Sequence, residues 1–195
     1  MRFGITFLPP DPATLIAWLR CAEAEGFDPI GIADSQSVYR ELYVAATLCA
    51  VHTMRVRFGP RVTNPITRHP AVTASAMATL EELAPGRTVL GLGTGDTAVA
   101  AVGLGGTTLA ALREYVTAVR GLMAGEEVRY QERGLRLTWA KARIPIYLAA
   151  HGPRGLELAG EIADGVIIGT GVLPEIVADV REHLRIGATR AGRRL

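Results

Sequence analysis

The sequence predicts an α/β protein built from repeated strand and helix units. Six short β-rich runs alternate with segments of helical periodicity along the whole chain. The β-rich runs are continuously apolar rather than alternating, which is typical of parallel strands buried on both faces. Glycine, at 22 of 195 residues, exceeds its usual share of roughly 7%. This excess indicates many tight turns or close backbone approaches.

Each expected strand is followed by an expected helix. The strands are residues 2–8, 28–33, 55–59, 88–92, 144–149 and 165–168. The helices cover residues 11–26, 41–53, 70–83, 109–123, 153–162 and 173–184, and the last one decays into a basic tail at 190–194. Gly26 suits a helix C-terminal cap, and Pro70 suits the first position of a helix.

One segment breaks this alternation. Residues 127–139 show period-2 patches around Gly134, which predicts a β-hairpin inserted before the fifth strand. We expect this hairpin to be a lid or a surface decoration.

Repeated βα units with right-handed crossovers form either a doubly wound sheet or a (β/α) barrel. The nucleotide-binding pattern G-x-G-x-x-G is missing after the first strand, which ends in Leu8-Pro9-Pro10, so the Rossmann interpretation fails. A barrel of eight units takes roughly 250 residues. Six units plus a hairpin therefore indicate a barrel that is incomplete by nature or a truncated product, and no linker divides residues 1–195 into two domains.

Composition excludes several classes of protein. Lysine and arginine number 21 against 19 acidic residues, a net charge of +2, which does not suggest a nucleic-acid partner. The longest apolar stretch, residues 43–51, is far shorter than the roughly 18 residues that span a bilayer, so no membrane partner is expected. Cys21 and Cys49 match neither a disulfide framework nor a zinc spacing. We expect a cytoplasmic protein.

Polar and glycine residues concentrate where the expected strands end, which is where βα proteins place their functional groups. These loops are residues 33–36, 59–70, 91–96, 149–155 and 169–171. The loop 91–96 (GLGTGD) would let backbone N–H groups approach a ligand, although Asp96 could equally cap a short helix after a tight turn. In the loop 149–155, Pro153 and Arg154 would start a helix suited to an anion. An ordinary turn with a surface arginine is the alternative.

Other chemistries lack support. His69 and His151 lie in such loops without acidic neighbours at metal-ligand spacing, so no metal site is expected. There is no G-x-S-x-G pattern and no phosphate-binding P-loop. A sugar- or phosphate-processing barrel rests on fold analogy alone, because paired acidic residues are missing from the strand ends.

The string at residues 59–96 (GPRVTNPITRHPAVTASAMATLEELAPGRTVLGLGTGD) resembles the bacterial luciferase-like oxidoreductase family. It is most similar to the branch of the coenzyme F420-dependent methylenetetrahydromethanopterin reductases. The strings at residues 1–9, 26–36, 144–167 and 187–194 resemble that branch in the same order.

The resemblance implies a (β/α)8 barrel, with FMN or the deazaflavin F420 bound at its C-terminal mouth and a small-molecule substrate. Its chemistry is hydride transfer or, with a true flavin, monooxygenation. The implied cofactor-binding residues are Asp34, Val62, Thr63, Asn64, Gly93, Thr94, Gly95, Asp96, Ala149, His151, Gly152 and Arg154. From its position in the first turn of a helix, we expect Arg154 to pair with a cofactor phosphate. The resemblance also implies a cis peptide at Arg61-Val62 that presents Val62 to the ring. Catalytic residues stay unassigned, because Thr6 and Ser35 replace a glutamate and a histidine of those reductases.

A second hypothesis is a non-catalytic, incomplete barrel that binds a flavin-type cofactor weakly or only forms oligomers. In a barrel short of two strands, the first and sixth strands expose unpaired backbone groups beside apolar faces. We therefore expect a homo-oligomer in either case.

Overall fold

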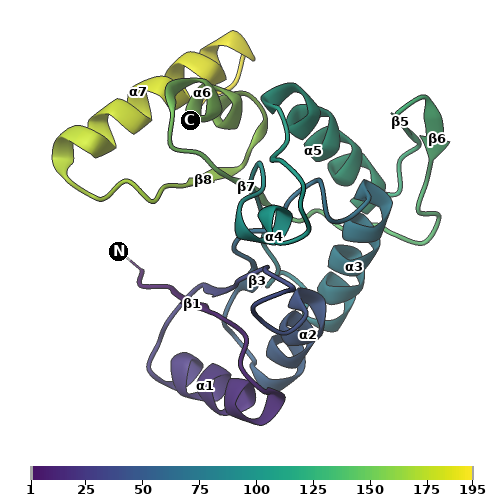
Figure 1. Cartoon of the computed structure of the whole chain (residues 1–195), viewed down its shortest axis with the longest axis vertical. Coiled ribbons are helices and arrows are strands. Elements are labelled where there is room, and N and C mark those ends of the chain that lie inside the picture. The colour runs from purple at the N-terminus through teal and green to yellow at the C-terminus, as the bar shows by residue number, and fades with distance from the viewer. Residues whose placement is uncertain (1, 195) are drawn as a thin grey trace.

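The computed structural model describes residues 2–194, in which short strands alternate with helices (Figure 1). The strands are β1 (Ile5–Phe7), β2 (Ile30–Ile32), β3 (Phe58–Pro60), β4 (Leu90–Leu92), β5 (Val128–Tyr130), β6 (Arg133–Leu135), β7 (Ile146–Ala149) and β8 (Gly165–Ile167). The helices are α1 (Pro12–Ala24), α2 (Leu42–His52), α3 (Pro70–Leu83), α4 (Thr97–Ala100), α5 (Leu109–Met123), α6 (Pro153–Ile162) and α7 (Pro174–Arg190). Each of the six predicted strand regions overlaps a parallel strand, although β3 runs one residue beyond its predicted end, so the α/β prediction is confirmed.

The parallel strands form two three-stranded sheets in the orders β1-β2-β3 and β4-β7-β8. Isolated parallel bridges from Phe58 to Thr88 and from Thr63 to Leu92 connect β3 to β4. Spatial order therefore follows chain order, and only the β5–β6 hairpin is left out of the series.

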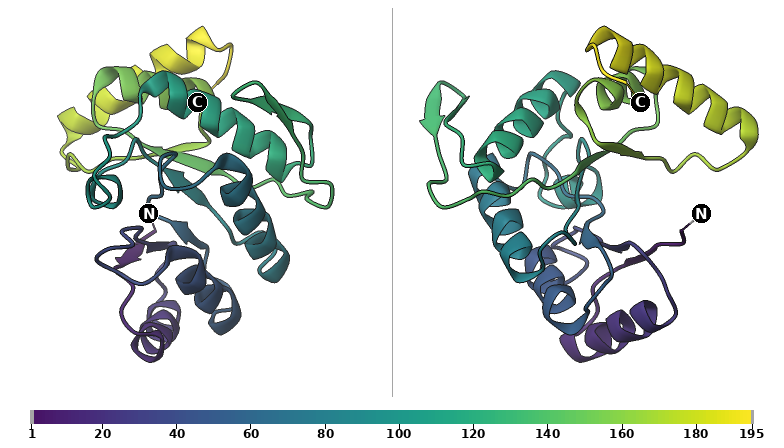
Figure 2. Two further views of the ribbon diagram at one scale, coloured as in Figure 1. Left: turned by 45° about the vertical axis from the view of Figure 1, so that its right-hand side comes forward. Right: turned by 180° about the vertical axis from the view of Figure 1, so that it is seen from behind.

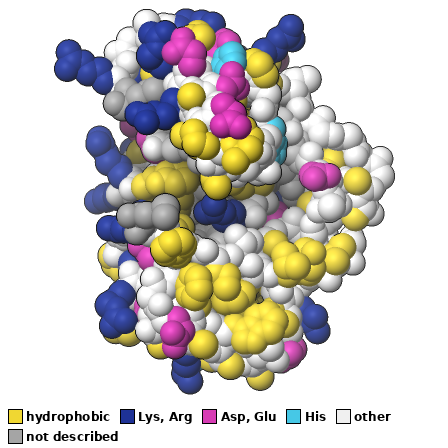
Figure 3. Space-filling view, turned by 90° about the vertical axis from the view of Figure 1, so that its left-hand side faces the viewer, with side chains coloured by type: hydrophobic (Ala, Val, Ile, Leu, Met, Phe, Trp, Pro, Cys, Tyr) yellow, Lys and Arg dark blue, Asp and Glu magenta, His cyan; other side chains and the backbone are white. Residues whose placement is uncertain are grey.

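The strands do not close into a barrel within residues 2–194, because β1 pairs only with β2 and β8 only with β7. The two further views show β1 with α1 on one side of the opening and β8 with α7 on the other (Figure 2). On this face, hydrophobic side chains gather over the part of the molecule that holds β1 and α1 (Figure 3). Two large hydrophobic side chains of this part of the chain, Phe3 just before β1 and Trp18 on α1, are 67% and 45% exposed.

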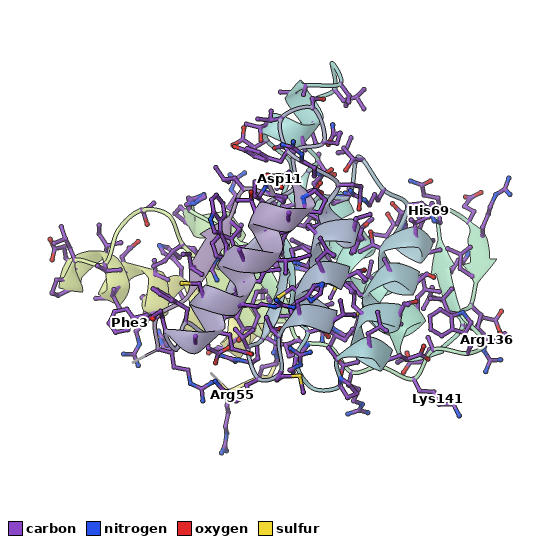
Figure 4. All side chains as sticks on the ribbon, turned by 90° about the horizontal axis from the view of Figure 1, so that it is seen from below. Phe3, Asp11, Arg55, His69, Arg136 and Lys141 are labelled. Atoms are coloured by element: carbon purple, nitrogen blue, oxygen red, sulfur yellow. The ribbon has the colours of Figure 1, made fainter. Side chains whose placement is uncertain are left out.

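The helix starts follow from local capping chemistry. The Asp11 carboxylate accepts a hydrogen bond from the Thr14 N–H at the start of α1, and the Glu41 carboxylate accepts one from Val44 at the start of α2. Prolines begin α1, α3, α6 and α7, where a missing N–H costs nothing. Asp11 and His69, which precede α1 and α3, lie at one end of the helices, and Arg55 lies at the other (Figure 4).

The apolar core lies between the strands and helices α1, α2, α3 and α5. Phe58, Leu90 and Ile146 on the strands are fully buried, as are Met77 on α3 and Tyr115 on α5. Strands β2, β3 and β4 are buried at every residue, as their continuous apolar sequence predicts, whereas β1 and β8 at the two ends of the series are only partly buried.

The last helix is longer than predicted. Helix α7 continues past Leu184 to Arg190 because its end packs on α6. A Cβ atom on Gly187 would lie 1.9 Å from the Glu157 carbonyl oxygen, so only glycine permits this contact. Arg190 adds ion pairs with Glu157 and Glu161 at 2.9 and 2.8 Å.

The inserted hairpin forms as predicted, but its turn lies at Gln131 and Glu132 rather than at Gly134, which lies within β6. Both turn residues have positive φ, 46° and 65°, as a two-residue hairpin turn matching the strand twist requires. The hairpin lies beyond α3 and His69, where Arg136 and Lys141 are labelled (Figure 4). None of its residues lines the strand-end cleft described below, and its side chains Val128, Tyr130 and Leu135 pack against the hydrophobic core.

No helix in the described part of the chain combines the length and apolar character needed to cross a bilayer.

Candidate functional site

The C-terminal ends of the parallel strands surround a cleft of about 450 Å³. Of the twelve residues expected to contact a cofactor, ten line this cleft: Asp34, Val62, Thr63, Asn64, Gly93, Thr94, Gly95, Asp96, Ala149 and His151. They come from the loops after β2, β3, β4 and β7, so one edge of the sheet brings together residues that are distant in sequence.

The backbone just after β3 forms the floor of this cleft. Along this stretch, its hydrogen-bonding partner changes from β2 to β4. The Arg61 N–H donates to the Ile32 carbonyl on β2, at 2.8 Å. Thr63 instead pairs with β4, donating to Gly91 and accepting from Gly93 at 3.0 and 2.9 Å. Val62 lies between these two contacts, half-buried and facing the cleft. The expected cis peptide at Arg61-Val62 is present.

Gly91 in β4 and Gly93 in the loop after it leave room for Pro60 and Val62. A Cβ atom on Gly91 would lie 2.3 Å from the Pro60 carbonyl oxygen and 3.0 Å from a Val62 methyl. A Cβ atom on Gly93 would lie 3.0 Å from the other Val62 methyl. The glycine-rich loop was expected to let a ligand approach its backbone closely. In the structure the Val62 side chain approaches this backbone, and the two glycines hold it at the cleft floor.

Asp34 is the innermost charged group of the cleft, with a side chain only 1% exposed. Its Oδ2 accepts hydrogen bonds from the Thr63 hydroxyl and from Nη1 of Arg68, both at 2.6 Å. A carboxylate buried this deeply needs such donors and a counter-charge. The ion pair thus fixes the position of the carboxylate beside Val62.

Arg68 belongs to the same polar cluster. Its Nη2 donates to Glu41 Oε1 at 2.9 Å, and its guanidinium lies 5.2 Å from the centre of the Tyr43 ring. Burial opposes its charge, yet the hydrogen bonds to Asp34 and Glu41 outweigh burial and raise the pKa of Arg68 above its ordinary value. The arginine therefore stays charged at any physiological pH.

The loop that carries Arg68 is fixed at both ends. The Asn64 side-chain oxygen accepts hydrogen bonds from the N–H groups of Ile66 and Thr67, both at 2.9 Å, in a local turn. The Tyr115 hydroxyl donates to the Arg68 carbonyl at 3.1 Å. Asn64 is thus a cleft residue whose oxygen is engaged by its own turn.

The glycine-rich loop after β4 leads into the short helix α4. Asp96 stands at its N-terminus, but its side chain makes no capping hydrogen bond. The helix is instead tied to the loop after β2, because Ser35 and Thr97 share a hydroxyl hydrogen bond and Gln36 donates to the Ala98 carbonyl at 2.7 Å. The Asp96 carboxylate remains exposed at the cleft rim.

The loop after β7 divides between two hollows. His151 lines the cleft, whereas Arg154, in the first turn of α6, borders a separate hollow between α5, α6 and α7. Gly152 lines neither of these hollows in the described residues. Pro153 begins α6 as predicted.

A larger hollow of about 650 Å³ lies at the opposite end of β7, between α5 and the end of α6. It contains none of the predicted functional residues. Parallel βα proteins bind ligands at the carboxyl ends of their strands, so the smaller cleft is the candidate site.

The cleft residues fit a flavin-type ring in chemical character. The Val62 side chain offers apolar surface at the floor, and the Asp34 carboxylate beside it can accept a hydrogen bond from a ring N–H or a hydroxyl group. The exposed groups at the rim, Arg61, Asp96 and His151, are polar.

Curated proteins similar to this chain match nearly its whole length. A 5,10-methylenetetrahydromethanopterin reductase of Methanolobus tindarius is 38% identical over 201 residues, which cover 99% of this chain and 61% of the reductase. An F420-dependent glucose-6-phosphate dehydrogenase of Nakamurella multipartita is 36% identical over 205 residues, which cover 94% of this chain and 60% of that enzyme. The chain thus spans about three fifths of the length of these relatives.

Solved structures share the fold. The coenzyme F420-dependent tetrahydromethanopterin reductase from Methanopyrus kandleri superposes with a TM-score of 0.85 at 32% identity, over 98% of this chain and 62% of that one. An F420-dependent secondary alcohol dehydrogenase, solved with an F420-acetone adduct, superposes with a TM-score of 0.83 at 22% identity, which shows the fold alone. The family described as luciferase-like monooxygenase matches residues 1–195. The chain therefore belongs to the luciferase-like monooxygenase family.

Proposed function

We propose that this chain binds F420 or FMN in the strand-end cleft and acts as an oxidoreductase on a small molecule. The observation that carries the proposal is the gathering of ten expected cofactor residues around one cleft, in which Asp34 is hydrogen-bonded to Thr63, the neighbour of Val62. Relatives at 36–38% identity are named as F420-dependent or as a methylenetetrahydromethanopterin reductase, which supports the same chemistry.

The residues of the cleft would divide the work between them. Val62 would support one face of the ring, and Asp34 would accept a hydrogen bond that fixes the ring in its plane. Arg61, Asp96 and His151 at the rim would meet the polar end of the cofactor or the substrate. The bound ring supplies hydride transfer or, as a true flavin, oxygen activation, while the protein orients it and excludes water.

Fluorescence titration tests the binding step. Purified protein should quench the fluorescence of F420 or of FMN at micromolar concentrations. Unchanged fluorescence of both compounds in excess protein would overturn the proposal. Steady turnover with a reducing or oxidising partner then distinguishes an oxidoreductase from a protein that only binds the cofactor.

We also propose that the parallel strands form an arc of a single (β/α)8 barrel domain. The superposition on the Methanopyrus kandleri reductase, which covers 62% of that longer chain, supports this arrangement. The 195-residue chain should self-associate, because β1 and β8 leave strand edges unpaired beside exposed apolar side chains. A monodisperse 20.8 kDa species in light scattering would contradict self-association.

A further inference from the structure

The two carboxylate oxygens of Asp34 have different surroundings. Within residues 2–194, both hydrogen bonds to the Asp34 carboxylate are made to Oδ2. Oδ1 receives no hydrogen bond. It is also absent from the side-chain atoms that are both fully enclosed and without a partner, so it is not sealed off from its surroundings. Since Asp34 lines the cleft, Oδ1 is the oxygen open to it.

Arg68 determines this asymmetry without lining the cleft itself. Its Nη1 lies 2.6 Å from Asp34 Oδ2 and 3.3 Å from the Thr63 hydroxyl, so it contacts both residues that hold the inner oxygen. Glu41 at the start of α2 holds the other nitrogen of the guanidinium, and the Tyr43 ring lies against its face. A side chain bound at three points has little rotamer freedom left.

We propose that Arg68 is a positioning residue of the cleft, which holds the Asp34 carboxylate with Oδ1 directed at an N–H or O–H group of the bound cofactor. The inference rests on the proposed function, because it takes that ligand to be F420 or FMN. A planar arginine fork can fix both the charge and the direction of a carboxylate, whereas lysine supplies the charge alone.

The charged and titratable groups around Asp34 leave Arg68 as its nearest cation. The loop after β3 contributes Arg68, α2 contributes Glu41 and Tyr43, and α5 contributes Tyr115. The cleft contributes Tyr39, Arg61, Asp96 and His151. Without Arg68, the buried carboxylate would lose the cation and the hydrogen bond that hold its inner oxygen in place.

The test measures dissociation constants for F420 and for FMN by fluorescence at pH 7.5. The variants are Arg68→Met, Arg68→Lys, Asp34→Asn and the double variant Asp34→Asn/Arg68→Met. Arg129→Met, which removes an exposed arginine of the hairpin, is the matched control. Each constant is divided by the wild-type value for the same ligand.

We expect Arg68→Met to weaken binding about tenfold, the range of a charge-assisted hydrogen bond. Arg68→Lys should weaken binding less, because lysine keeps the charge but not the planar fork, and Arg129→Met should change nothing. In the Asp34→Asn background, Arg68→Met should have less than about a threefold effect, since no carboxylate remains to be positioned.

Equal effects of Arg68→Met in the wild-type and Asp34→Asn backgrounds would show a merely structural role and overturn the inference. If Arg68→Met does not fold, the same cycle is run with Arg68→Lys, whose cation stays in place, and the same criterion applies. Wild-type protein that binds neither F420 nor FMN overturns the proposed function and this inference together. Wild-type binding with an unaltered Arg68→Met overturns the inference alone.

Discussion

Arg57 binds Asp28 through both its side chain and its backbone. Its guanidinium donates to both carboxylate oxygens at 3.1–3.2 Å, and its N–H donates to Asp28 Oδ1 at 3.0 Å. This pair joins the chain just before β2 to the chain just before β3. Burial opposes ionisation of Asp28, but the hydrogen bonds from Arg57 outweigh it and hold the pKa of Asp28 below its usual value.

The pair predicts a pH-dependent contribution to stability. A carboxyl whose pKa is lowered by folding stabilises the protein above its unfolded pKa of about 4, and this contribution is lost as pH falls through the folded pKa. Asp28→Asn should therefore lower the free energy of unfolding by about 1 kcal/mol at pH 7 and by almost nothing near pH 2.5. Urea denaturation at both pH values checks this. An equal loss at both would contradict the ionic origin, and Arg129→Met, which removes an exposed arginine far from this pair in the sequence, is the control.

The two cysteines should differ in reactivity. Cys21 is exposed on α1, whereas Cys49 is buried in α2, where burial raises the pKa of its thiol to about 12. Because the thiolate is the reactive form, a thiol reagent at pH 8 should modify one cysteine in the native protein and both in denaturant. Cys21→Ser should leave the native protein unreactive. Rapid native labelling of that variant would show that α2 opens readily.

The close contacts of β4 predict unequal costs for two similar substitutions. Gly91→Ala would press a methyl group against the Pro60 backbone at 2.3 Å and should destabilise the protein by about 3 kcal/mol. Gly93→Ala meets only a Val62 methyl at 3.0 Å, which can shift, so about 1 kcal/mol is expected. Chemical denaturation measures both. The reverse order would mean that Val62, not the Pro60 backbone, is the rigid partner.

The hydrogen bonds of the buried Tyr115 hydroxyl should contribute to the free energy of unfolding. It bonds the Thr73 hydroxyl at 2.6 Å and the Arg68 carbonyl at 3.1 Å, in a side chain with no exposed surface. Tyr115→Phe leaves both partners short of a bond and should cost about 1–2 kcal/mol. Tyr130→Phe, on the half-buried hairpin strand, should cost little. A fall in melting temperature for Tyr130→Phe alone would refute the assignment.

Sequence patterns located every parallel strand, because a short, continuous apolar run between turn residues is typical of a buried strand. They could not fix the end of α7, which depends on Gly187 lying against the Glu157 carbonyl of another helix. They raised the short helix α4 only as an alternative, and the Asp96 cap proposed for it makes no hydrogen bond. Tertiary contacts from Ser35 and Gln36 hold α4 in place, and local sequence does not report them.

The candidate site, too, was only partly predictable from the sequence. The loops at strand ends were recognisable because glycines and polar residues cluster there, and the fold brings ten of their residues to one cleft. Arg68 and Glu41 were not identified, although Arg68 lies within the recognised T-R-H-P string. Their pairing joins positions 27 residues apart, and no periodicity marks such a pair.

The order of the parallel strands also bears on how the chain folds as it leaves the ribosome. Successive strands from β1 to β4 and from β7 to β8 pair with partners no more than about 30 residues back, so each unit meets a formed edge soon after its synthesis. Leu90 and Ile146, in contrast, are 56 residues apart. The edge of β4 therefore stays unpaired until α5 and the whole hairpin have emerged. During that interval it is the most exposed strand edge in the nascent chain for pairing with another molecule.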